Sequence, residues 1–406
     1  MQLSRTPKTS DYFGRYYTQA DVASLLVESM RAGDPRIAID LGAGDGALVS
    51  EASRHWNRAE FVTVDIDHHA ESSTFRDLRG PAFTHHTVDA LDSHLAERIG
   101  LRYGHVDSGL CNPPYVRPRW RKHFAEILED AGLSHVVPKI GAVQADVLFI
   151  AQNLRFLRRG GKLGLILPDG VVAGEKYAKL RQTLATAHTL ERVIELPRRV
   201  FRNTDAKAHI VVLTKHRQEH VDIQVQCLKE NGLLTAPICL DPERAAARLD
   251  YSYLAALEQV NARESGTTLR SVTQMLTRGS HSSSQLKLLS YPVFHTTDFV
   301  EGSVEVPRQF RLAREARKVA AGGVVAVAGD ILLARVGRNL EQKVGVVNQG
   351  AIAVSDCILV LRVEPAYQAR ALQYFTSTKG RATLRATSHG VGAKFITTDS
   401  LLRLEI

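Results

Sequence analysis

The hydrophobic pattern of the first half of the chain alternates between short apolar runs and a longer segment with helical spacing. Apolar runs that end in glycine, acidic or proline residues predict buried strands at 36–44, 60–67 and 162–168. Apolar residues three and four positions apart predict a helix over 146–157, and the glycine pair at 160–161 ends it. Strands that alternate with helices predict an α/β fold, with a parallel sheet covered by helices.

The pattern continues with further strand-like runs and then changes after about residue 216. Four more strands are expected at 105–114, 190–197, 208–215 and 221–228, and a helix over 241–260 is expected to mark a boundary. Beyond it, short apolar runs separated by turn residues predict a β-rich (α+β) second domain. The sequence therefore predicts two domains, at residues 1–240 and 241–406.

Composition narrows the class of protein. The 406 residues are 44% hydrophobic, enough for packed cores, and the formal net charge of +9 suits a polyanionic partner. The four cysteines are scattered with no metal-binding spacing, so we expect reduced thiols and no metal site. The polar N-terminus and the lack of any apolar run of ~18 residues predict a cytoplasmic protein with no membrane partner.

A glycine-rich loop, DLGAGDG (40–46), follows the first strand and opens a helix. Glycines allow a tight turn and let a ligand approach the backbone. Asp65 ends the next strand, where a carboxylate can bind ribose hydroxyls. The third glycine of the dinucleotide fingerprint is missing, and Asp40 at the strand end repels a pyrophosphate but suits an ammonium group. The loop therefore favours S-adenosyl-L-methionine over NAD.

The stretch CNPPYV (111–116) combines an amide, a rigid carbonyl and an aromatic ring. An aromatic exocyclic amine is a poor nucleophile because its lone pair is delocalised into the ring. The side-chain oxygen of Asn112 and the carbonyl oxygen of Pro113 can accept hydrogen bonds from the two N–H groups of this amine. Tyr115 can stack on the base. Such a site acts by positioning and electrostatics, without a covalent intermediate.

In this order, the motifs resemble those of the gamma group of adenine-N6 DNA methyltransferases of restriction–modification systems. The resemblance spans roughly residues 12–216 and includes 13–28, similar to the family's leading helix, and 200–215, similar to the segment that contacts a flipped-out base. Asp65 stands where the family often has Glu. The resemblance implies a Rossmann-like class I S-adenosylmethionine-dependent methyltransferase domain followed by a DNA target-recognition domain.

The same resemblance assigns site residues. It implies catalytic roles for Asn112, Pro113, Pro114 and Tyr115, and stacking on the target base by Tyr115 and Phe201. The cofactor contacts that it implies are Thr18, Asp40, Gly42, Ala43, Gly44, Asp65, Ile66, Asp89, Ala90 and Asn112.

The Asn-Pro-Pro-Tyr motif alone does not fix the substrate, because enzymes that methylate a glutamine of protein release factors also carry it. Residues 270–406 resemble the target-recognition domains of restriction–modification specificity subunits, through segments such as AGDILLARVG. This favours double-stranded DNA as partner, with a separate cognate restriction endonuclease as a candidate second partner. A protein glutamine N5-methyltransferase and a catalytically inactive DNA-binding relative remain the alternatives.

Cationic residues follow the motif directly in RPRWRK (117–122). Arginine and lysine beside an aromatic suit a loop that grips phosphates next to a flipped-out nucleotide, although a solvated surface loop has the same composition. The residues expected at DNA are Arg117, Arg119, Trp120, Arg121 and Lys122, with Arg335, Arg338 and Lys394 in the second domain.

Overall fold

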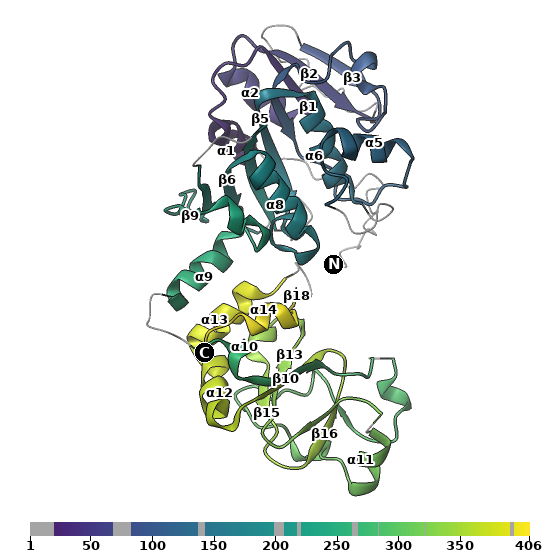
Figure 1. The fold of residues 1–406 in the computed structure, drawn as a ribbon, viewed down its shortest axis with the longest axis vertical. Coiled ribbons are helices and arrows are strands. Elements are labelled where there is room, and N and C mark those ends of the chain that lie inside the picture. Colours follow the sequence, from purple (N-terminus) through teal and green to yellow (C-terminus); the bar gives the residue numbers. More distant parts are fainter. Residues whose placement is uncertain are drawn as a thin grey trace, which may run out of the picture. The chain divides into compact units, whose positions relative to one another are not determined.

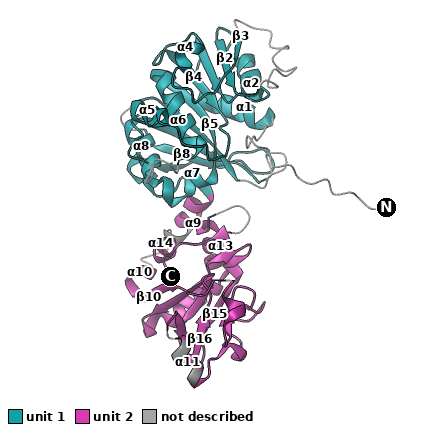
Figure 2. Ribbon diagram, turned by 90° about the vertical axis from the view of Figure 1, so that its right-hand side faces the viewer, with its two compact units in different colours: residues 1–251 teal, residues 252–406 magenta. Residues whose placement is uncertain are grey.

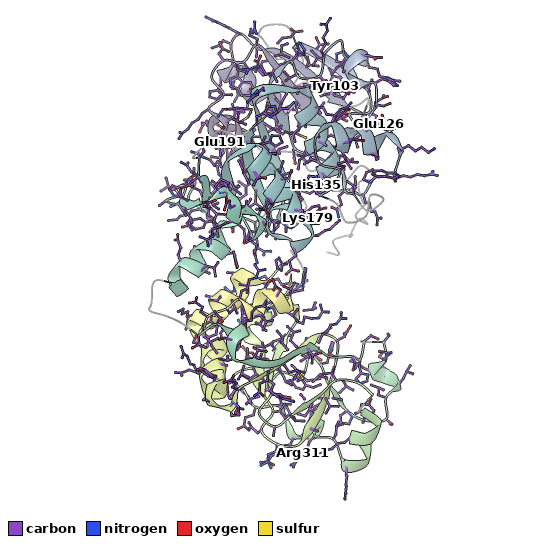
Figure 3. All side chains as sticks on the ribbon, viewed as in Figure 1. Tyr103, Glu126, His135, Lys179, Glu191 and Arg311 are labelled. Atoms are coloured by element: carbon purple, nitrogen blue, oxygen red, sulfur yellow. The ribbon has the colours of Figure 1, made fainter. Side chains whose placement is uncertain are left out.

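The protein is described by a computed structural model (Figure 1). The residues that it describes are 20–67, 83–136, 143–198, 207–216, 221–261, 267–282, 284–320, 322–389 and 394–406. Their side chains are drawn in Figure 3, except those at 259–261, 315, 318 and 319. The chain divides into two compact units, Met1–Tyr251 and Ser252–Ile406 (Figure 2).

The first unit is built on a nine-stranded sheet with the order β3-β2-β1-β4-β5-β7-β6-β8-β9. Strands β1 to β5 are parallel to their neighbours, whereas β7 runs antiparallel between β5 and β6. The predicted parallel sheet is thus confirmed for the part of the chain that holds the glycine loop and the Asn-Pro-Pro-Tyr motif. The strands are β1 (Ile37–Leu41), β2 (Glu60–Asp65), β3 (Phe83–Thr87), β4 (Val106–Cys111), β5 (Leu157–Pro168), β6 (Thr189–Glu195), β7 (Ala208–Thr214), β8 (Ile223–Cys227) and β9 (Ile238–Leu240).

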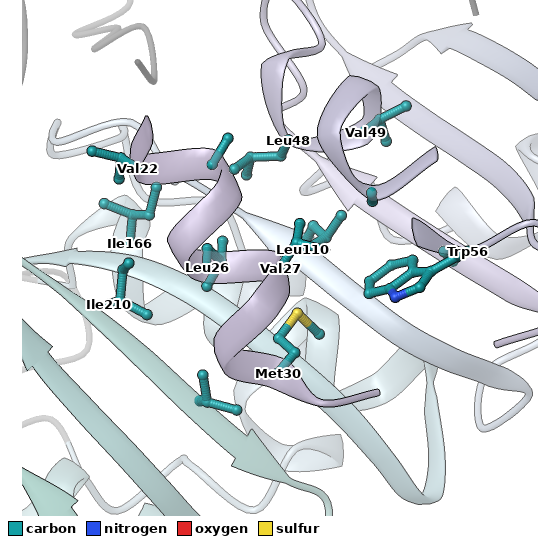
Figure 4. Close-up of a cluster of buried hydrophobic side chains, with 14 of the residues drawn as sticks. Val22, Leu26, Val27, Met30, Leu48, Val49, Trp56, Leu110, Ile166 and Ile210 are labelled. Carbon is teal, nitrogen blue, oxygen red and sulfur yellow. The ribbon is translucent and has the colours of Figure 1, made fainter. Parts of the chain in front are cut away.

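Helices cover this sheet through apolar stripes. In α1, Val22, Leu26 and Met30 recur four residues apart, so they form one buried stripe that packs against α2 and the sheet (Figure 4). A Cβ at Gly164 of β5 would lie 2.6 Å from Met30 Sδ, so this glycine lets α1 lie close to the strand. The helices of the first unit are α1 (Ala20–Met30), α2 (Ala47–His55), α4 (Leu95–Arg98), α5 (His123–Asp130), α6 (Ala145–Phe156), α7 (Asp169–Ala173), η3 (Glu175–Tyr177), α8 (Ala178–Ala187) and η4 (Pro242–Ala246). The next helix, α9 (Tyr251–Asn261), begins at the last residue of the first unit and otherwise belongs to the second.

Residues 241–250 belong to the first unit, so the structure moves the boundary from 240/241 to 251/252. The helix expected over 241–260 is also wrong, because a short 3-10 turn and α9 replace it. Arg181 of α8 gives the physical reason. Its buried guanidinium donates to the carbonyl oxygens of residues 245, 246 and 247, which ties this segment to α8 and takes carbonyls that a continuous helix would use.

The described residues of the second unit form three small sheets, and their longest helices are α9, α12 and α13. Its four-stranded antiparallel sheet has the order β10-β17-β13-β15, and α12 and α13 contribute to the core beside it. This matches the expected β-rich character. The strands are β10 (Thr273–Arg278), β11 (Val293–Phe294), β12 (Val325–Val327), β13 (Ile331–Ala334), β14 (Val336–Gly337), β15 (Val344–Val346), β16 (Ala351–Val354), β17 (Ile358–Val363) and β18 (Lys394–Phe395). The helices are α10 (Leu269–Val272), η5 (Leu286–Leu288), η6 (Arg308–Phe310), α11 (Arg314–Ala320), η7 (Leu340–Gln342), η8 (Pro365–Tyr367), α12 (Gln368–Thr376), α13 (Thr378–Thr387) and α14 (Thr398–Leu402).

Within the described ranges, none of the helices has the length and apolar character needed to cross a membrane.

Candidate active site

A cavity of about 440 Å³ lies in the first unit, at the residues that follow β1, β2, β3 and β4. Because the carboxyl ends of parallel strands meet at one edge, loops far apart in the sequence converge here. Of the residues singled out from the sequence, the cavity wall contains Gly42, Ala43, Gly44, Asp65, Ile66, Asp89, Ala90, Asn112, Pro114, Arg117, Arg119 and Arg121. Thr18 and Phe201 lie outside the described residues.

The glycine loop is pinned to the end of β2. Gly42 and Gly44 have φ values of +78° and +56°, in the left-handed region that favours glycine. The backbone N–H of Gly42 donates to the Val64 carbonyl at 2.8 Å, and that of Gly44 donates to Asp65 Oδ2 at 2.8 Å. A Cβ at Gly44 would meet no atom within 4 Å, so the backbone at this position is open to a ligand. The loop and Asp65 therefore form one structural unit.

The Asp65 carboxylate accepts two backbone hydrogen bonds in addition to the ligand contact expected from the sequence. Its Oδ1 accepts from the backbone N–H of Asp67 at 2.8 Å, while Oδ2 accepts from Gly44. The side chain is mostly buried but lines the cavity. Each carboxylate oxygen has a further lone pair, so Asp65 can hold the loop and accept from a ligand hydroxyl at the same time.

Asp40 does not line the cavity. As the fourth residue of β1, it lies opposite Thr63 of β2 and Leu110 of β4, and it is 0% exposed. Burial, and then the charges of Asp65 and Asp45, raise the pKa of Asp40 well above its usual value. Both of its carboxylate oxygens lack a hydrogen-bond partner within the described part of the chain. The structure therefore places Asp40 behind the cavity wall, and its contact with a cofactor stays a prediction.

The Asn-Pro-Pro-Tyr motif begins where β4 ends. Asn112 and Pro114 line the cavity, whereas Pro113 is buried and Tyr115 is half-buried beside it. The Tyr115 hydroxyl donates to the carbonyl of Ile166 in β5 at 3.4 Å. The backbone N–H of Ala145, at the start of α6, donates to the Val116 carbonyl at 3.0 Å. The motif is thus held between β5 and α6, with its amide on the cavity wall.

The cationic segment is also part of this wall. Arg121 Nη1 donates to Asp89 Oδ2 at 2.6 Å, which joins a residue expected at DNA to a residue expected at the cofactor. The Trp120 ring lies 5.5 Å from the ring of Phe124 in an edge-to-face arrangement, and Lys122 is exposed and does not line the cavity. A residue expected to bind DNA and a residue expected to bind the cofactor are therefore in contact on one cavity wall.

Several wall residues were not singled out from the sequence. Phe149 of α6 contacts the glycine loop, since a Cβ at Gly42 would lie 3.1 Å from its ring. It lies within the helix predicted over 146–157, and no pattern in the sequence marked it as a wall residue. Asp45 is an acid inside the glycine loop, and this position in the motif could have marked it as a wall residue. The other wall residues missed are Ala47, Leu48, Leu91, Val116, Pro118, Phe124 and Ala145.

In the second unit, the cations expected at DNA gather at one small sheet. Arg335 and Arg338 flank β14, which pairs with β18 so that Gly337 lies opposite Lys394. Arg338 is exposed, whereas Arg335 is half-buried and donates to the Asp356 carbonyl at 2.8 Å. Burial, and then the charge of Arg278, lower the pKa of Arg335. Arg335 is therefore engaged with the backbone at Asp356, whereas Arg338 is exposed.

The first unit is similar to proteins of known families. A family model described as N-6 DNA Methylase matches residues 3–233. The methylase subunit of the type I restriction enzyme MjaVII from Methanocaldococcus jannaschii is 22% identical over 216 residues, which are 51% of this chain and 37% of that protein.

Solved structures are similar as well. The type IIG restriction endonuclease BpuSI has a TM-score of 0.54 and 14% identity, covering 97% of this chain and 59% of that one. A type I restriction–modification methyltransferase subunit from Streptococcus thermophilus has a TM-score of 0.44 and 20% identity, covering 56% and 50%. The chain thus spans less than two thirds of each of these proteins.

Proposed function

Because this chain belongs to the N-6 DNA methylase family, we propose that it transfers a methyl group from S-adenosylmethionine to the N6 amine of a flipped-out adenine in duplex DNA, at a specific sequence. Its first unit has the Rossmann-like fold of class I S-adenosylmethionine-dependent methyltransferases. The observation that carries the proposal is the single cavity whose wall contains the glycine loop, Asp65, Asp89 and Asn112.

The cavity fits the proposed cofactor. Its volume lies within the ~300–1,000 Å³ typical of small-molecule sites. Gly44 offers open backbone, Asp65 offers acceptor lone pairs for ribose hydroxyls, and the 49% exposed Ile66 offers an apolar surface for an adenine ring. The buried carboxyl group of Asp40 lies behind the loop with a raised pKa and no hydrogen-bond partner in the described residues, and a cationic amino-acid group bound at the loop would favour its ionised form. When bound, the cofactor supplies an activated methyl group on a sulfonium.

The protein's own residues would position the adenine amine. The Asn112 side-chain oxygen and the Pro113 carbonyl oxygen would accept hydrogen bonds from the two N–H groups of the amine. The nitrogen lone pair would then be less delocalised into the ring. The proline rings fix the direction of the carbonyl. The hydrogen bond from Tyr115 to Ile166 holds the aromatic ring in one orientation, ready to stack on the extruded base.

We assign sequence recognition to the second unit, because a flipped-out base exposes no flanking sequence to the catalytic cavity. Arg338 and Lys394 would contact DNA phosphates, while other side chains of this unit would contact base edges. A separate restriction endonuclease is the proposed biological partner, in keeping with the restriction systems in which the similar proteins are named. We propose a cytoplasmic location, in keeping with a DNA substrate.

Exchange of residues 252–406 with the second unit of a relative should move the methylated motif to that of the relative. The cut after Tyr251 keeps the segment that Arg181 ties to the first unit. Mapping of methylated adenines in cells that express the chimaera checks this result. A chimaera that still marks the original motif would place recognition in the first unit, with residues 117–122 as the leading candidate.

Replacement of Asp65 by alanine should weaken cofactor binding ~10- to 100-fold. It removes an acceptor for a ligand hydroxyl and also the anchor of the Gly44 N–H, and hydrogen bonds to a charged group contribute ~1.5–3 kcal/mol. Calorimetric titration with S-adenosylhomocysteine measures the change. The matched control is Asp34→Ala, since Asp34 also accepts a backbone N–H but does not line the cavity. Equal affinities of wild type and Asp65→Ala would remove Asp65 from the binding site.

The proposed reaction is tested with purified protein, labelled S-adenosylmethionine and genomic DNA that lacks adenine methylation. Digestion to nucleosides should place the label in N6-methyldeoxyadenosine. Label in a methylated cytosine would contradict the assigned base. Label that appears only in glutamine of an added release factor would contradict DNA as the substrate and support the alternative left open by the motif.

A further inference from the structure

Both carboxylate oxygens of Asp89 are already engaged. Oδ1 accepts from the backbone N–H of Leu91 at 2.9 Å, and Oδ2 accepts from Arg121 Nη1 at 2.6 Å. Leu91 belongs to the same turn as Asp89, so the first bond fixes the side chain in place. The second bond places a guanidinium on Oδ2, at the cavity wall. A ligand that contacts this oxygen through an N–H donor would share it with Arg121 or take the place of Arg121.

Arg121 lies on a stretch that is held at both ends, residues 116–124, called the wall segment below. At one end the Val116 carbonyl accepts from Ala145, and at the other His123 Nε2 contacts the Leu91 carbonyl at 2.9 Å while Phe124 is only 1% exposed. Between these anchors the arginine side chains lie at the surface of the cavity. Arg121 can therefore change partner by rotating its side chain, without unfolding the wall segment.

The pair between Arg121 and Asp89 is easily displaced. The two side chains are 52% and 27% exposed, and ion pairs this open to water contribute little to stability because solvent screens them. A guanidinium always carries its proton, so once released it keeps its positive charge and favours another anion. The phosphates of a DNA duplex gripped by the wall segment would supply that anion.

We propose that Arg121 is exchanged between Asp89 and DNA, so that binding of the cofactor prepares the wall segment to grip the duplex. The inference rests on the proposed function. Without cofactor, Arg121 covers Asp89 and one cation is withheld from DNA. When an adenine amine of the cofactor donates to Asp89 Oδ2, Arg121 is released to a phosphate. Because coupling of two binding events is reciprocal, DNA should favour cofactor binding to the same extent.

The salt dependence of DNA binding tests this directly. The probes are a mixed-sequence duplex and S-adenosylhomocysteine, which cannot turn over. Each phosphate contact adds ~0.9 to the slope of log affinity against log salt concentration. Saturation of the wild-type protein with S-adenosylhomocysteine should steepen the slope by about that amount. Equal slopes with and without S-adenosylhomocysteine would overturn the exchange.

Two variants give opposite signatures. Arg121→Gln should show the shallow slope in both states, because the exchanged cation is missing. Asp89→Asn should show the steep slope even without cofactor, because nothing holds Arg121 back. Arg119→Gln is the matched control: Arg119 lines the same cavity, is exposed and forms no ion pair within the described ranges. The slope of this variant should still be steeper with S-adenosylhomocysteine than without it. Equal slopes for Arg119→Gln in the two states would contradict a specific role of Arg121.

Cofactor affinity supplies an independent measurement. Removal of the competing guanidinium in Arg121→Gln should tighten S-adenosylhomocysteine binding ~1.5- to 5-fold, the range expected for loss of an exposed ion pair. A variant that merely damaged the wall would bind more weakly, which would overturn the exchange. If wild-type protein failed to bind S-adenosylhomocysteine at all, the proposed function itself would fail, and the exchange with it.

Discussion

Replacement of Asn112 by alanine should lower the rate of methyl transfer by ~10²–10³-fold. The change removes one of two acceptors at the reacting amine, and loss of a single positioned electrostatic group typically has an effect of this size. The loss should appear in kcat, because the acceptor acts on the bound adenine as its lone pair attacks. Single-turnover methylation of DNA with saturating S-adenosylmethionine measures it.

The control for Asn112 is the acid at the same position. Asn112→Asp keeps an acceptor oxygen on the cavity wall and should retain more activity than the alanine variant. Calorimetry with S-adenosylhomocysteine shows whether the cofactor site has survived in both variants. Full methyl transfer by Asn112→Ala would rule out the proposed role of the amide, whatever the product.

Replacement of Lys207 by methionine should lower the free energy of unfolding by about 3–5 kcal/mol, because it leaves buried carboxylates without their shared cation. Lys207 Nζ lies 2.9 Å from Glu195 Oε1, 3.6 Å from Asp169 Oδ1 and 3.8 Å from Asp250 Oδ2. These three acids are at most 11% exposed at their side chains. Urea denaturation of both proteins at neutral pH measures the difference.

The same cluster should make the first unit sensitive to acid. Burial by itself would raise the pKa of Asp169, but the hydrogen bond with His209 and the charge of Lys207 hold it below its usual range. The folded-state pKa is therefore depressed. Its contribution to stability is present above the ordinary carboxyl pKa and is lost as the pH falls toward the lowered value.

Lys162→Met is the matched control for Lys207. Lys162 also pairs with a carboxylate, Glu191 of β6 (labelled in Figure 3), at 2.8 Å, but the two side chains are 23% and 28% exposed. An ion pair that water reaches contributes at most ~1 kcal/mol. An equal fall in the free energy of unfolding for the two lysine variants would contradict a larger contribution to stability from the buried cluster around Lys207.

The sequence predicted the parts of the site that follow from topology. Strand ends in a parallel sheet converge at one edge, so Gly44, Asp65 and Asn112 had to meet once β1, β2 and β4 were parallel neighbours. Each of these residues lies at the end of a strand, or shortly after one, that its apolar run makes recognisable. The alternation with helices predicted parallel strands, but it does not by itself give their order in the sheet.

Contacts that depend on side-chain packing could not be anticipated. Nothing in the pattern shows that Arg121 would return to Asp89, because the path of the wall segment is set by anchors on α6 and Leu91. The seclusion of Asp40 depends on the strands to both sides of β1. The unit boundary moved because one buried residue, Arg181, binds carbonyl groups more than sixty positions away.

Methylation of adenine at a specific DNA sequence is the function that we propose for this chain. Its most direct test is expression in cells that lack adenine methylation, followed by single-molecule sequencing of their DNA. We expect N6-methyladenine at one recurring motif with the wild-type protein, and its near absence with Asn112→Ala. Methylation confined to cytosine, or no DNA methylation while the purified protein modifies a release-factor glutamine, would contradict it.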